Sequence, residues 1–421
     1  SNDDDIWSYT LSTSPNAFPV QYSDGTLSGP STDAGQNPWN LLVHSGYREQ
    51  FWNSAQSLIG LTQDMGKIWE PLEGLTANVK FSWDAWNTTS QRRYKTPTTY
   101  HAHGRAEDGS LIYDDNNGDG IWDPVHTGDE KLGYTVGRSG TMTTYLEGSL
   151  TYNRIFADQH RVGALFLYNQ KIRTNTQAES GDDALPYKNQ GLAGRLTYAF
   201  RDTYFAEFNV GYNGSENFAR GHRFGFFPAF SLGWVVSEES FFNTSVVDYL
   251  KLRASYGLVG NDQIGGDRFL YLSLWQSADD GQFGYPNPTG GGGGVNEKRT
   301  GNESLTWEKA KKFNFGVDTR LFRSQLELTA DVFYERRSNI LTNVDIVPGT
   351  YGGPAIQANA GIVENKGLEF DATWRGRIGK DIEYFVGGNY SFARNKIIEK
   401  PESPQAYDYL YATGRRVGQP L

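Results

Sequence analysis

Alternation of apolar and polar residues is the dominant pattern along this chain. From residue 75 to residue 85 the odd positions carry Leu, Ala, Val, Phe, Trp and Ala, whereas the even positions carry Thr, Asn, Lys, Ser and Asp. Successive side chains of a β-strand point to opposite faces, so this segment has one face suited to apolar surroundings and one suited to water. The same alternation recurs along the chain. It predicts about twelve long strands, which start near Ser57, Leu75, Thr143, Arg161, Leu192, Tyr204, Phe226, Leu250, Phe313, Leu326, Leu368 and Ile382.

Short and long connections alternate between these strands. Tight turns are predicted near Asp158 and at residues 201–203, 323–324 and 376–380. The intervening connections are long and cover residues 88–140, 174–190, 213–225, 260–312 and 338–366. A tilted strand needs roughly 9–11 residues to cross a bilayer, and outer-membrane barrels have short periplasmic turns and long extracellular loops. We therefore predict an all-β fold, a large antiparallel transmembrane outer-membrane β-barrel, with the glycines Gly290–Gly294 at a flexible extracellular loop tip.

The polar face of the predicted strands repeatedly carries Lys, Arg, Glu and Asp, for example Lys251, Arg253, Asp318 and Glu327. The interior of a large soluble barrel would be apolar, so this face fits a water-filled or plugged lumen. The alternative is an amphipathic antiparallel sheet that packs against another body.

Composition narrows the functional classes. The chain has 421 residues, 49 of them Gly, and 14% of its residues are aromatic. The net charge of −10 argues against nucleic-acid binding, and no apolar run approaches the roughly 18 residues of a membrane helix. Cysteine is absent, which excludes disulfides and Cys-ligated metals. The sequence contains no G-x-S-x-G, no H-E-x-x-H, no Walker A loop and no dinucleotide-binding fingerprint, so we expect no enzymatic activity. Carboxylates are too numerous, however, for counting alone to exclude a glycosidase pair.

One segment has the spacing of a calcium-binding loop. Residues 115–123 read Asp-Asn-Asn-Gly-Asp-Gly-Ile-Trp-Asp and fit the first half of such a loop. The closing Glu is missing, because position twelve is His126, and Asp114, Asp129 or Glu130 could supply further oxygens. The alternative is an acidic turn without an ion. The predicted ligands of a structural calcium ion are Asp115, Asn117, Asp119, Ile121 (through its carbonyl) and Asp123.

Two further groups of residues are candidates for binding. His101 and His103 share a strand face and could chelate a metal, but no third ligand is evident, so we interpret them as lumen or loop histidines. Aromatic residues in the long connections could stack on sugar rings or peptide side chains, or could pack the loops together. They are Trp275, Phe283, Tyr285, Tyr351 and Tyr407.

Several ordered motifs resemble one family. They are the segments 14–20, 212–218, 224–234, 250–257 and 359–369, together with Gly260-Asn261; the most distinctive reads Asn-Ala-Gly-Ile-Val-Glu-Asn-Lys-Gly-Leu-Glu from Asn359. These motifs are similar to those of SusC/RagA-type TonB-dependent outer-membrane transporters of Bacteroidota, and they spread over most of the chain.

The resemblance implies a 22-stranded barrel of which residues 1–421 form part, with the N-terminal plug and the first and last barrel strands absent from this chain. It also implies import of oligosaccharides or peptides through the outer-membrane lipid, driven by TonB acting on the plug. A SusD-like surface lipoprotein is the implied partner, and a dimer of transporter–lipoprotein pairs is usual in the family. Two alternatives stay open: a passive porin, or a barrel component of another secretion or structural assembly.

Overall fold

The computed structural model describes residues 3–419 apart from 15, 17, 31–36, 116, 117, 119, 130, 179, 180, 182, 264–267, 283–290, 345 and 347–349. The chain divides into two compact units. The smaller unit consists of Ser1–Ala55, Ala85–Met142 and Asn175–Ala178, and the larger unit of Gln56–Asp84, Thr143–Thr174 and Glu179–Leu421.

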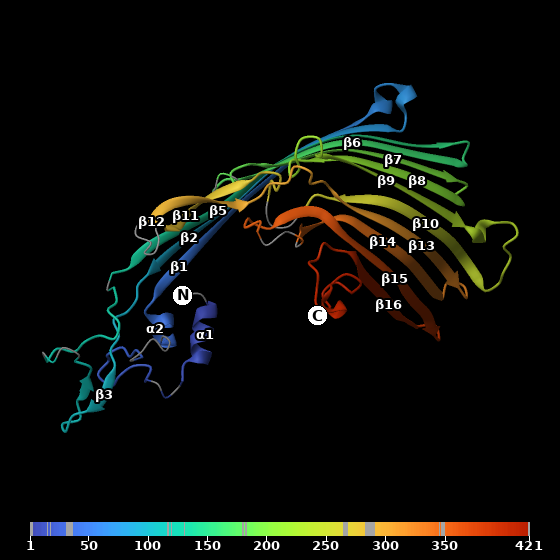
Figure 1. Cartoon of the computed structure of the whole chain (residues 1–421). Helices are drawn as coiled ribbons and strands as arrows, with labels where there is room; N and C mark the ends of the chain where they lie inside the picture. Colours follow the sequence, from blue (N-terminus) through green and yellow to red (C-terminus); the bar gives the residue numbers. More distant parts are fainter. Residues whose placement is uncertain are drawn as a thin grey trace. The chain divides into compact units, whose positions relative to one another are not determined.

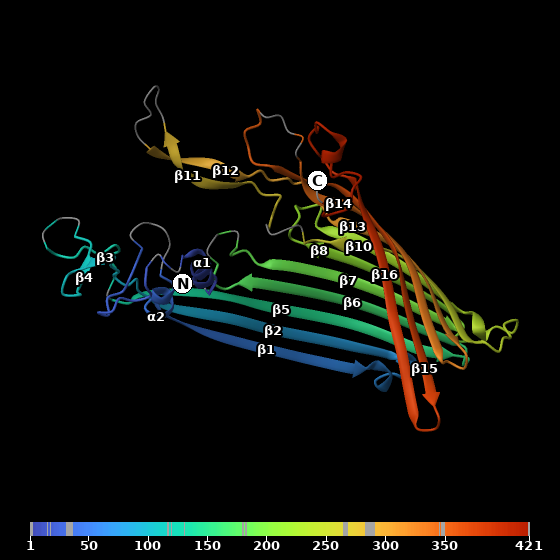
Figure 2. The same ribbon diagram turned by 90° about the horizontal axis from the view of Figure 1, so that it is seen from below.

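A twelve-stranded sheet is the main element of the fold, and its strands lie side by side in chain order. From β6 to β16 every neighbouring pair is antiparallel, and the strand direction turns progressively in Figure 2. The twelve predicted strands are confirmed. They are β1 (Gly46–Asp64), β2 (Leu75–Tyr94), β5 (Gly133–Phe156), β6 (His160–Asn175), β7 (Tyr187–Phe200), β8 (Tyr204–Ser215), β9 (Phe224–Val235), β10 (Val247–Asn261), β13 (Glu308–Leu321), β14 (Leu326–Val344), β15 (Ile356–Ile378) and β16 (Ile382–Glu399), labelled in Figure 1.

Tight turns join the strands at one end, as predicted. Ala157 and Asp158, between β5 and β6, have φ of 49° and 55°, and Arg201 and Asp202, between β7 and β8, both have φ of 51°. Two consecutive left-handed residues match the right-handed twist of antiparallel strands, so such turns close a hairpin without splaying it. Short 3₁₀ segments lie in the two longer connections at this end: η1 (Met65–Lys67), η2 (Glu70–Leu72) and η3 (Val236–Glu238).

The predicted strand starts are wrong at the opposite, loop end. Strands β1, β5 and β15 begin at Gly46, Gly133 and Ile356, about ten residues before the starts that alternation indicated. β5 and β15 follow long connections between strands of the sheet, whereas β1 is its first strand. Backbone pairing therefore continues beyond the segment in which one face is apolar. Alternation of hydropathy cannot reveal that part of the strand.

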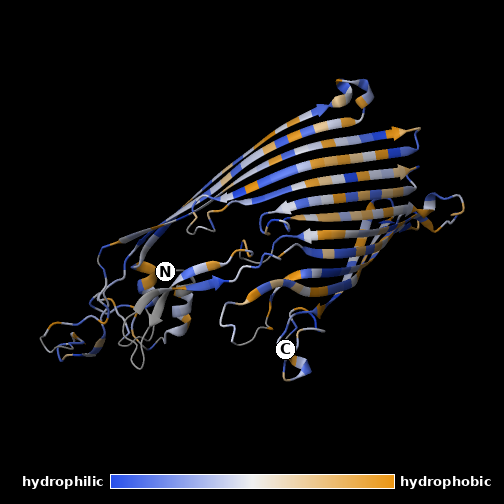
Figure 3. Ribbon diagram, turned by 45° about the horizontal axis from the view of Figure 1, so that its top comes forward, coloured by the Kyte–Doolittle hydropathy of each residue, from blue (hydrophilic) through white to orange (hydrophobic). Residues whose placement is uncertain are grey.

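The apolar face has a definite height, best seen in β14. Its outward series is Leu326, Leu328, Ala330, Val332 and Tyr334, which spans about 26 Å along the strand at ~3.3 Å per residue. The next outward residue is Arg336, whose Nη1 lies 2.7 Å from Glu364 Oε1 of β15. Figure 3 shows the alternation of apolar and polar positions along the strands. Because barrel strands tilt by about 35–45°, this run spans roughly 20 Å across a membrane, comparable with the roughly 25 Å hydrocarbon belt of outer-membrane barrels, and a lipid-facing position accounts for the exposure of Val332 (58%).

The smaller unit contains two helices that alternation did not predict, α1 (Asp3–Ser12) and α2 (Pro38–Val43). The Asn37 side chain caps α2 by accepting from the Trp39 amide at 3.1 Å, and the buried Asn40 donates from Nδ2 to the Ser28 carbonyl at 3.0 Å. A helix of this length is too short to show a 3.6-residue period. Among the described residues, no helix is long and apolar enough to span a membrane.

Two small hairpins lie within the long connections: β3 (Ala102–Arg105) with β4 (Leu111–Tyr113), and β11 (Leu274–Gln282) with β12 (Gly291–Arg299). The prediction of a flexible glycine tip is therefore wrong for residues 291–294, which belong to β12 and pair with β11; Gly290 lies outside the described residues. A glycine run carries no side-chain pattern, so the sequence could not distinguish a loop from a backbone ladder.

Candidate functional site

The polar face of the larger unit is cross-linked by ion pairs between neighbouring strands. Arg253 of β10 donates from Nε to Asp318 of β13 at 3.1 Å and from Nη2 to Asp331 of β14. Gly316 lies between them in register, and a Cβ there would come within 2.5 Å of the Arg253 guanidinium carbon. The glycine thus lets the guanidinium lie flat across β13 and reach the second carboxylate. Thr329 Oγ1 completes the network by donating to Asp318 at 3.3 Å.

Similar pairs continue along this face. Each is partly exposed to solvent, so each contributes at most about 1 kcal/mol to stability. Together they keep one face of the sheet hydrophilic and place positive and negative charges next to each other. Such a face suits a barrel lumen that is filled with water or with a polar plug. The pairs are Lys80–Glu147 (3.0 Å), Arg195–Glu207 (3.0 Å), Lys312–Glu335 (3.6 Å) and Arg320–Glu327 (3.6 Å).

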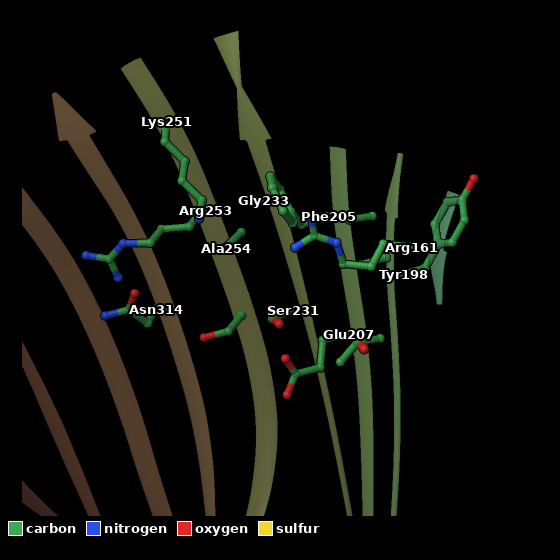
Figure 4. A pocket seen from close by; sticks show the side chains of 14 residues that line it. Arg161, Tyr198, Phe205, Glu207, Ser231, Gly233, Lys251, Arg253, Ala254 and Asn314 are labelled. Carbon is green, nitrogen blue, oxygen red and sulfur yellow. The ribbon is translucent and has the colours of Figure 1, made fainter. Parts of the chain in front are cut away.

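A shallow hollow of about 510 Å³ opens on the same face (Figure 4). Lys251 lies over the Phe205 ring, with its Nζ 4.9 Å from the ring centroid. The hollow offers cationic, anionic and amide groups without any cluster that resembles a catalytic centre. Its polar lining comes from six adjacent strands, β6 to β10 and β13, and consists of Arg161, Thr197, Tyr198, Glu207, Ser231, Lys251, Arg253, Ser255 and Asn314.

A buried apolar cluster, which we call the loop-base cluster, lies at the loop end of the larger unit. It consists of Phe218, Phe227, Leu270, Leu305 and Trp307, all at most 8% exposed. The Trp307 ring centroid lies 5.5 Å from that of Phe218 and 5.2 Å from that of Phe227. The cluster therefore attaches both ends of the connection 262–307 to β9 and to the connection before it.

Hydrogen bonds brace the same region. Trp307 Nε1 donates to the Arg223 carbonyl at 3.0 Å. Asn359 accepts from the Thr306 amide at 2.8 Å and donates from Nδ2 to the carbonyls of Thr306 and Asn339 at 2.9 and 2.7 Å. Asn302 Nδ2 donates to the Gln357 carbonyl at 2.8 Å. The connection before β9 and the connection 262–307 are thereby tied to each other, and the latter is also tied to β15 and, through Asn359, to β14.

Sequence reasoning did not find this cluster, although the family motifs that it quoted contain two of the cluster's members and the neighbouring Asn359. Phe218 and Asn359 lie in the motifs 212–218 and 359–369, and Phe227 in the motif 224–234. The missed signal is an apolar residue out of step with alternation, such as Leu305 or Trp307 in a long polar connection.

The structure describes part of the predicted calcium loop. The Asp115 carboxylate accepts from the amides of Gly118 (2.7 Å) and Gly120 (2.9 Å), whose φ values are 68° and 79°. The Asp123 amide donates to the Asp114 carbonyl at 2.8 Å. Ile121 is 66% exposed, while Asn117 and Asp119 lie outside the described residues. Backbone and carboxylate thus form a tight turn around Asp115.

The start of this loop is packed within the smaller unit. Tyr113, which is 2% exposed, lies 4.5 Å from the ring centroid of Trp122 and donates its hydroxyl to Asp24 at 2.7 Å. The Thr26 amide and the Tyr113 hydroxyl lower the pKa of Asp24, and burial raises the pKa of Tyr113. The pair is therefore ionised on the aspartate and neutral on the tyrosine over a wide pH range.

His101 and His103 both contact one carboxylate. Their Nδ1 atoms lie 3.3 and 3.0 Å from the two different oxygens of Asp114. No group of three or more ligating side chains that could hold a metal ion occurs among the described residues. The interpretation of both residues as lumen or loop histidines stays a prediction.

The candidate aromatic residues are only partly described. Trp275 of β11 is 64% exposed, and Tyr351 is 40% exposed with its hydroxyl 3.0 Å from Thr300 Oγ1. Phe283 and Tyr285 lie outside the described residues.

Comparison with known proteins decides between the barrel and the alternative sheet. The family described as "TonB dependent receptor-like, beta-barrel" matches residues 1–421. The chain belongs to the TonB-dependent receptor β-barrel family. Barrels of this family lie in the outer membrane, so the polar face is the lumen wall and the apolar face contacts lipid.

The relatives are of the SusC/RagA type. This TonB-dependent receptor barrel is 28% identical over 327 residues to TonB-dependent receptor P39 of Formosa agariphila, covering 70% of the chain and 30% of that protein. It is 27% identical over 254 residues to TonB-dependent receptor SusC of Bacteroides thetaiotaomicron, covering 60% and 24%.

A solved structure titled as the RagAB peptide importer in the closed-closed state matches with a TM-score of 0.64 at 18% identity, covering 90% of this chain and 40% of that one. The chain thus spans less than half the length of these relatives. These relatives are receptors and an importer by name, not enzymes.

Proposed function

We propose that the chain forms part of the wall of a TonB-dependent importer that carries oligosaccharides or peptides across the outer membrane. The observation that carries the proposal is the charged lumen face, in which Arg253 alone bridges Asp318 and Asp331. A lumen wall of paired charges offers a polar substrate or plug many hydrogen-bond partners that it can exchange as it moves, and no apolar surface to which it would adhere. The family and the names of SusC and RagAB support import.

We further propose a SusD-like surface lipoprotein as the partner and TonB, acting through a plug, as the source of energy. The braced loop end supports a partner at the outer mouth, because loops held by the loop-base cluster present a fixed surface. We also propose that two transporter–lipoprotein pairs associate as a dimer.

The test uses the full-length protein in its native membrane. Tagged protein is purified in mild detergent, and co-eluting proteins are identified by mass spectrometry. A stoichiometric surface lipoprotein supports the partner, and its absence contradicts it. Uptake of labelled oligosaccharides and peptides is compared in cells with and without TonB. Uptake that is lost without TonB supports active import, whereas uptake that persists would favour a passive porin.

We also propose that the loop 115–123 binds a structural calcium ion through Asp115, Asn117, Asp119, Ile121 and Asp123. The turn around Asp115 supports this, because Gly118 and Gly120 adopt the left-handed conformation that a sharp ligand loop requires. Isothermal titration with Ca²⁺ on full-length protein and on Asp119→Ala tests it. Binding by the wild type that is lost in the variant is expected, and equal heats from both would contradict the site.

For the aromatic candidates, Trp275 and Tyr351 are proposed as substrate contacts on the strength of their exposure. Alanine at either position should then raise the substrate concentration needed for half-maximal uptake. Unchanged uptake kinetics in both variants would assign these residues to loop packing.

A further inference from the structure

The segment after β16 is a folded loop at the extracellular end of the sheet. It lies opposite the β15–β16 turn (Figure 2) and contains the short 3₁₀ element η4 (Asp408–Leu410). It is tied back to β16, because the Ile397 amide donates to the Arg415 carbonyl at 2.8 Å and the Gly414 amide donates to the Ile397 carbonyl at 2.7 Å. The loop therefore has a fixed base.

The partly buried carboxylate of Glu402 holds the two sides of the loop together through hydrogen bonds. Glu402 accepts from the Ala412 amide at 2.7 Å and from the amide and hydroxyl of Thr413 at 2.8 and 2.6 Å. Burial alone would raise the pKa of Glu402, but the hydrogen bonds from Thr413 and Ala412 outweigh it and lower the pKa. The Tyr411 hydroxyl accepts from the Gln405 amide at 2.9 Å. The backbone on both sides of η4 is thus set by contacts that do not involve the rings of Tyr407 and Tyr409.

These two tyrosines form a stacked pair that faces solvent. Their ring centroids are 5.4 Å apart and their planes differ by 9°. They are 61% and 57% exposed. Neither hydroxyl has a hydrogen-bond partner in the described part of the chain. Neither ring stabilises the loop through a ring contact with another described element. A loop with a fixed backbone that holds two aromatic rings in water has the features of a preorganised binding surface.

We propose that Tyr407 and Tyr409 form a stacking platform for a pyranose ring at the extracellular mouth. An aromatic face is electronegative, and the C–H groups on one side of a pyranose carry partial positive charge, so the two surfaces attract. The free phenol hydroxyls and the exposed Gln405 and Asp408 side chains can exchange hydrogen bonds with sugar hydroxyls. The platform rests on the proposed import function for its role, and it favours oligosaccharides over peptides as the substrate class.

The shape of the site favours a sugar over an extended peptide. One common way for an extended peptide to bind is to add a strand to a sheet edge, and the described residues 400–419, which carry the tyrosine pair, contain no strand. A proline-rich peptide can also stack on aromatic rings, so it is included in the test as a competitor.

The experiment uses full-length receptor, purified with any lipoprotein that co-elutes. Binding of maltohexaose, cellohexaose, xylohexaose and laminarihexaose, and of a decaproline peptide, is measured by isothermal titration. At least one hexaose should bind, and Tyr407→Ala with Tyr409→Ala should weaken it about tenfold. The double Phe variant, which keeps both ring faces, should stay within about threefold. Trp69→Ala removes an equally exposed ring (62%) at the opposite end of the sheet and should have no effect.

Hydroxyl-radical footprinting of the wild type removes any dependence on variant folding. The bound hexaose should protect Tyr407 and Tyr409 and leave Trp69 unprotected. The proposal is overturned if no hexaose binds, if the double Ala variant binds as the wild type does, or if only decaproline protects the pair. TonB-dependent uptake of a hexaose that continues unchanged in the double Ala variant would leave the importer standing and remove the platform. If hexaose binding is intact but uptake does not depend on TonB, the platform would stand and the proposed active import would be wrong.

Discussion

Replacement of Trp307 by alanine tests whether the loop-base cluster holds the long connection 262–307 in place. The indole is 5% exposed and contacts both Phe218 and Phe227. Truncation of a buried Trp costs about 3–5 kcal/mol, of which the lost Nε1 hydrogen bond contributes about 1 kcal/mol. The Arg223 carbonyl that accepted this bond keeps a second donor, the Ser215 amide at 3.0 Å, so no buried acceptor is orphaned. Most of the cost is therefore that of the cavity left by the indole.

The loss should appear locally, because the cluster lies beyond the apolar band. Hydrogen exchange within 262–307 should speed up by roughly a hundredfold or more, while amides of β13 and β14 exchange as before. Trp307→Phe should recover most of the protection. Trp275→Ala is the matched control, because that indole is 64% exposed and its loss should change little. Equal effects of Trp307→Ala and Trp275→Ala, or melting of the whole barrel by Trp307→Ala, would refute this reasoning.

Two further predictions concern the wall and the extracellular rim. Ala330→Arg places a charge at the middle of the apolar band and should lower the free energy of unfolding in lipid vesicles by about 2–4 kcal/mol. Thr329→Arg is the control: it lies one residue away, is flanked in register by Asp318 and Asp371, and should change the free energy of unfolding by about 1 kcal/mol or less. Equal losses in the two variants would mean that the two faces of the sheet are assigned wrongly. The lowered pKa of Glu402 means that its hydrogen bonds stabilise the loop fully above the ordinary value of 4.5 and are lost as the pH falls through the lowered pKa. Exchange of the Thr413 amide should therefore accelerate in that acidic range in the wild type, and a Glu402→Gln variant with the same pH profile would contradict this.

Much of the sheet could be predicted from sequence because lipid and water select for different side chains on its two faces. The start of β14 at Leu326 was placed correctly, since the apolar series begins there. The start of β15 was placed at Leu368 instead of Ile356, since Lys366 and Glu364 on the outward face already lie beyond the apolar band. Backbone pairing needs no particular side chain, so hydropathy does not reveal where it ends.

The functional surfaces were less predictable, because they depend on contacts between distant segments. Trp307 packs on Phe218, 89 positions away in the sequence, and nothing local to either residue indicates that contact. The Arg253 network needs Gly316 on the intervening strand, which only the register reveals. Tyr407 was recognised as an exposed aromatic, but its pairing with Tyr409 depends on the backbone of η4 and on Glu402.

The central claim is that β14 and its neighbours separate lipid from a polar lumen, and site-directed spin labelling measures this most directly. The chain has no cysteine, so single cysteines at residues 328–333 can be labelled in turn in the full-length protein in lipid vesicles. We predict that oxygen, which concentrates in lipid, reaches labels at Leu328, Ala330 and Val332 best, while a water-soluble nickel chelate reaches those three least. A profile without this period of two, or with the faces reversed, would contradict the account.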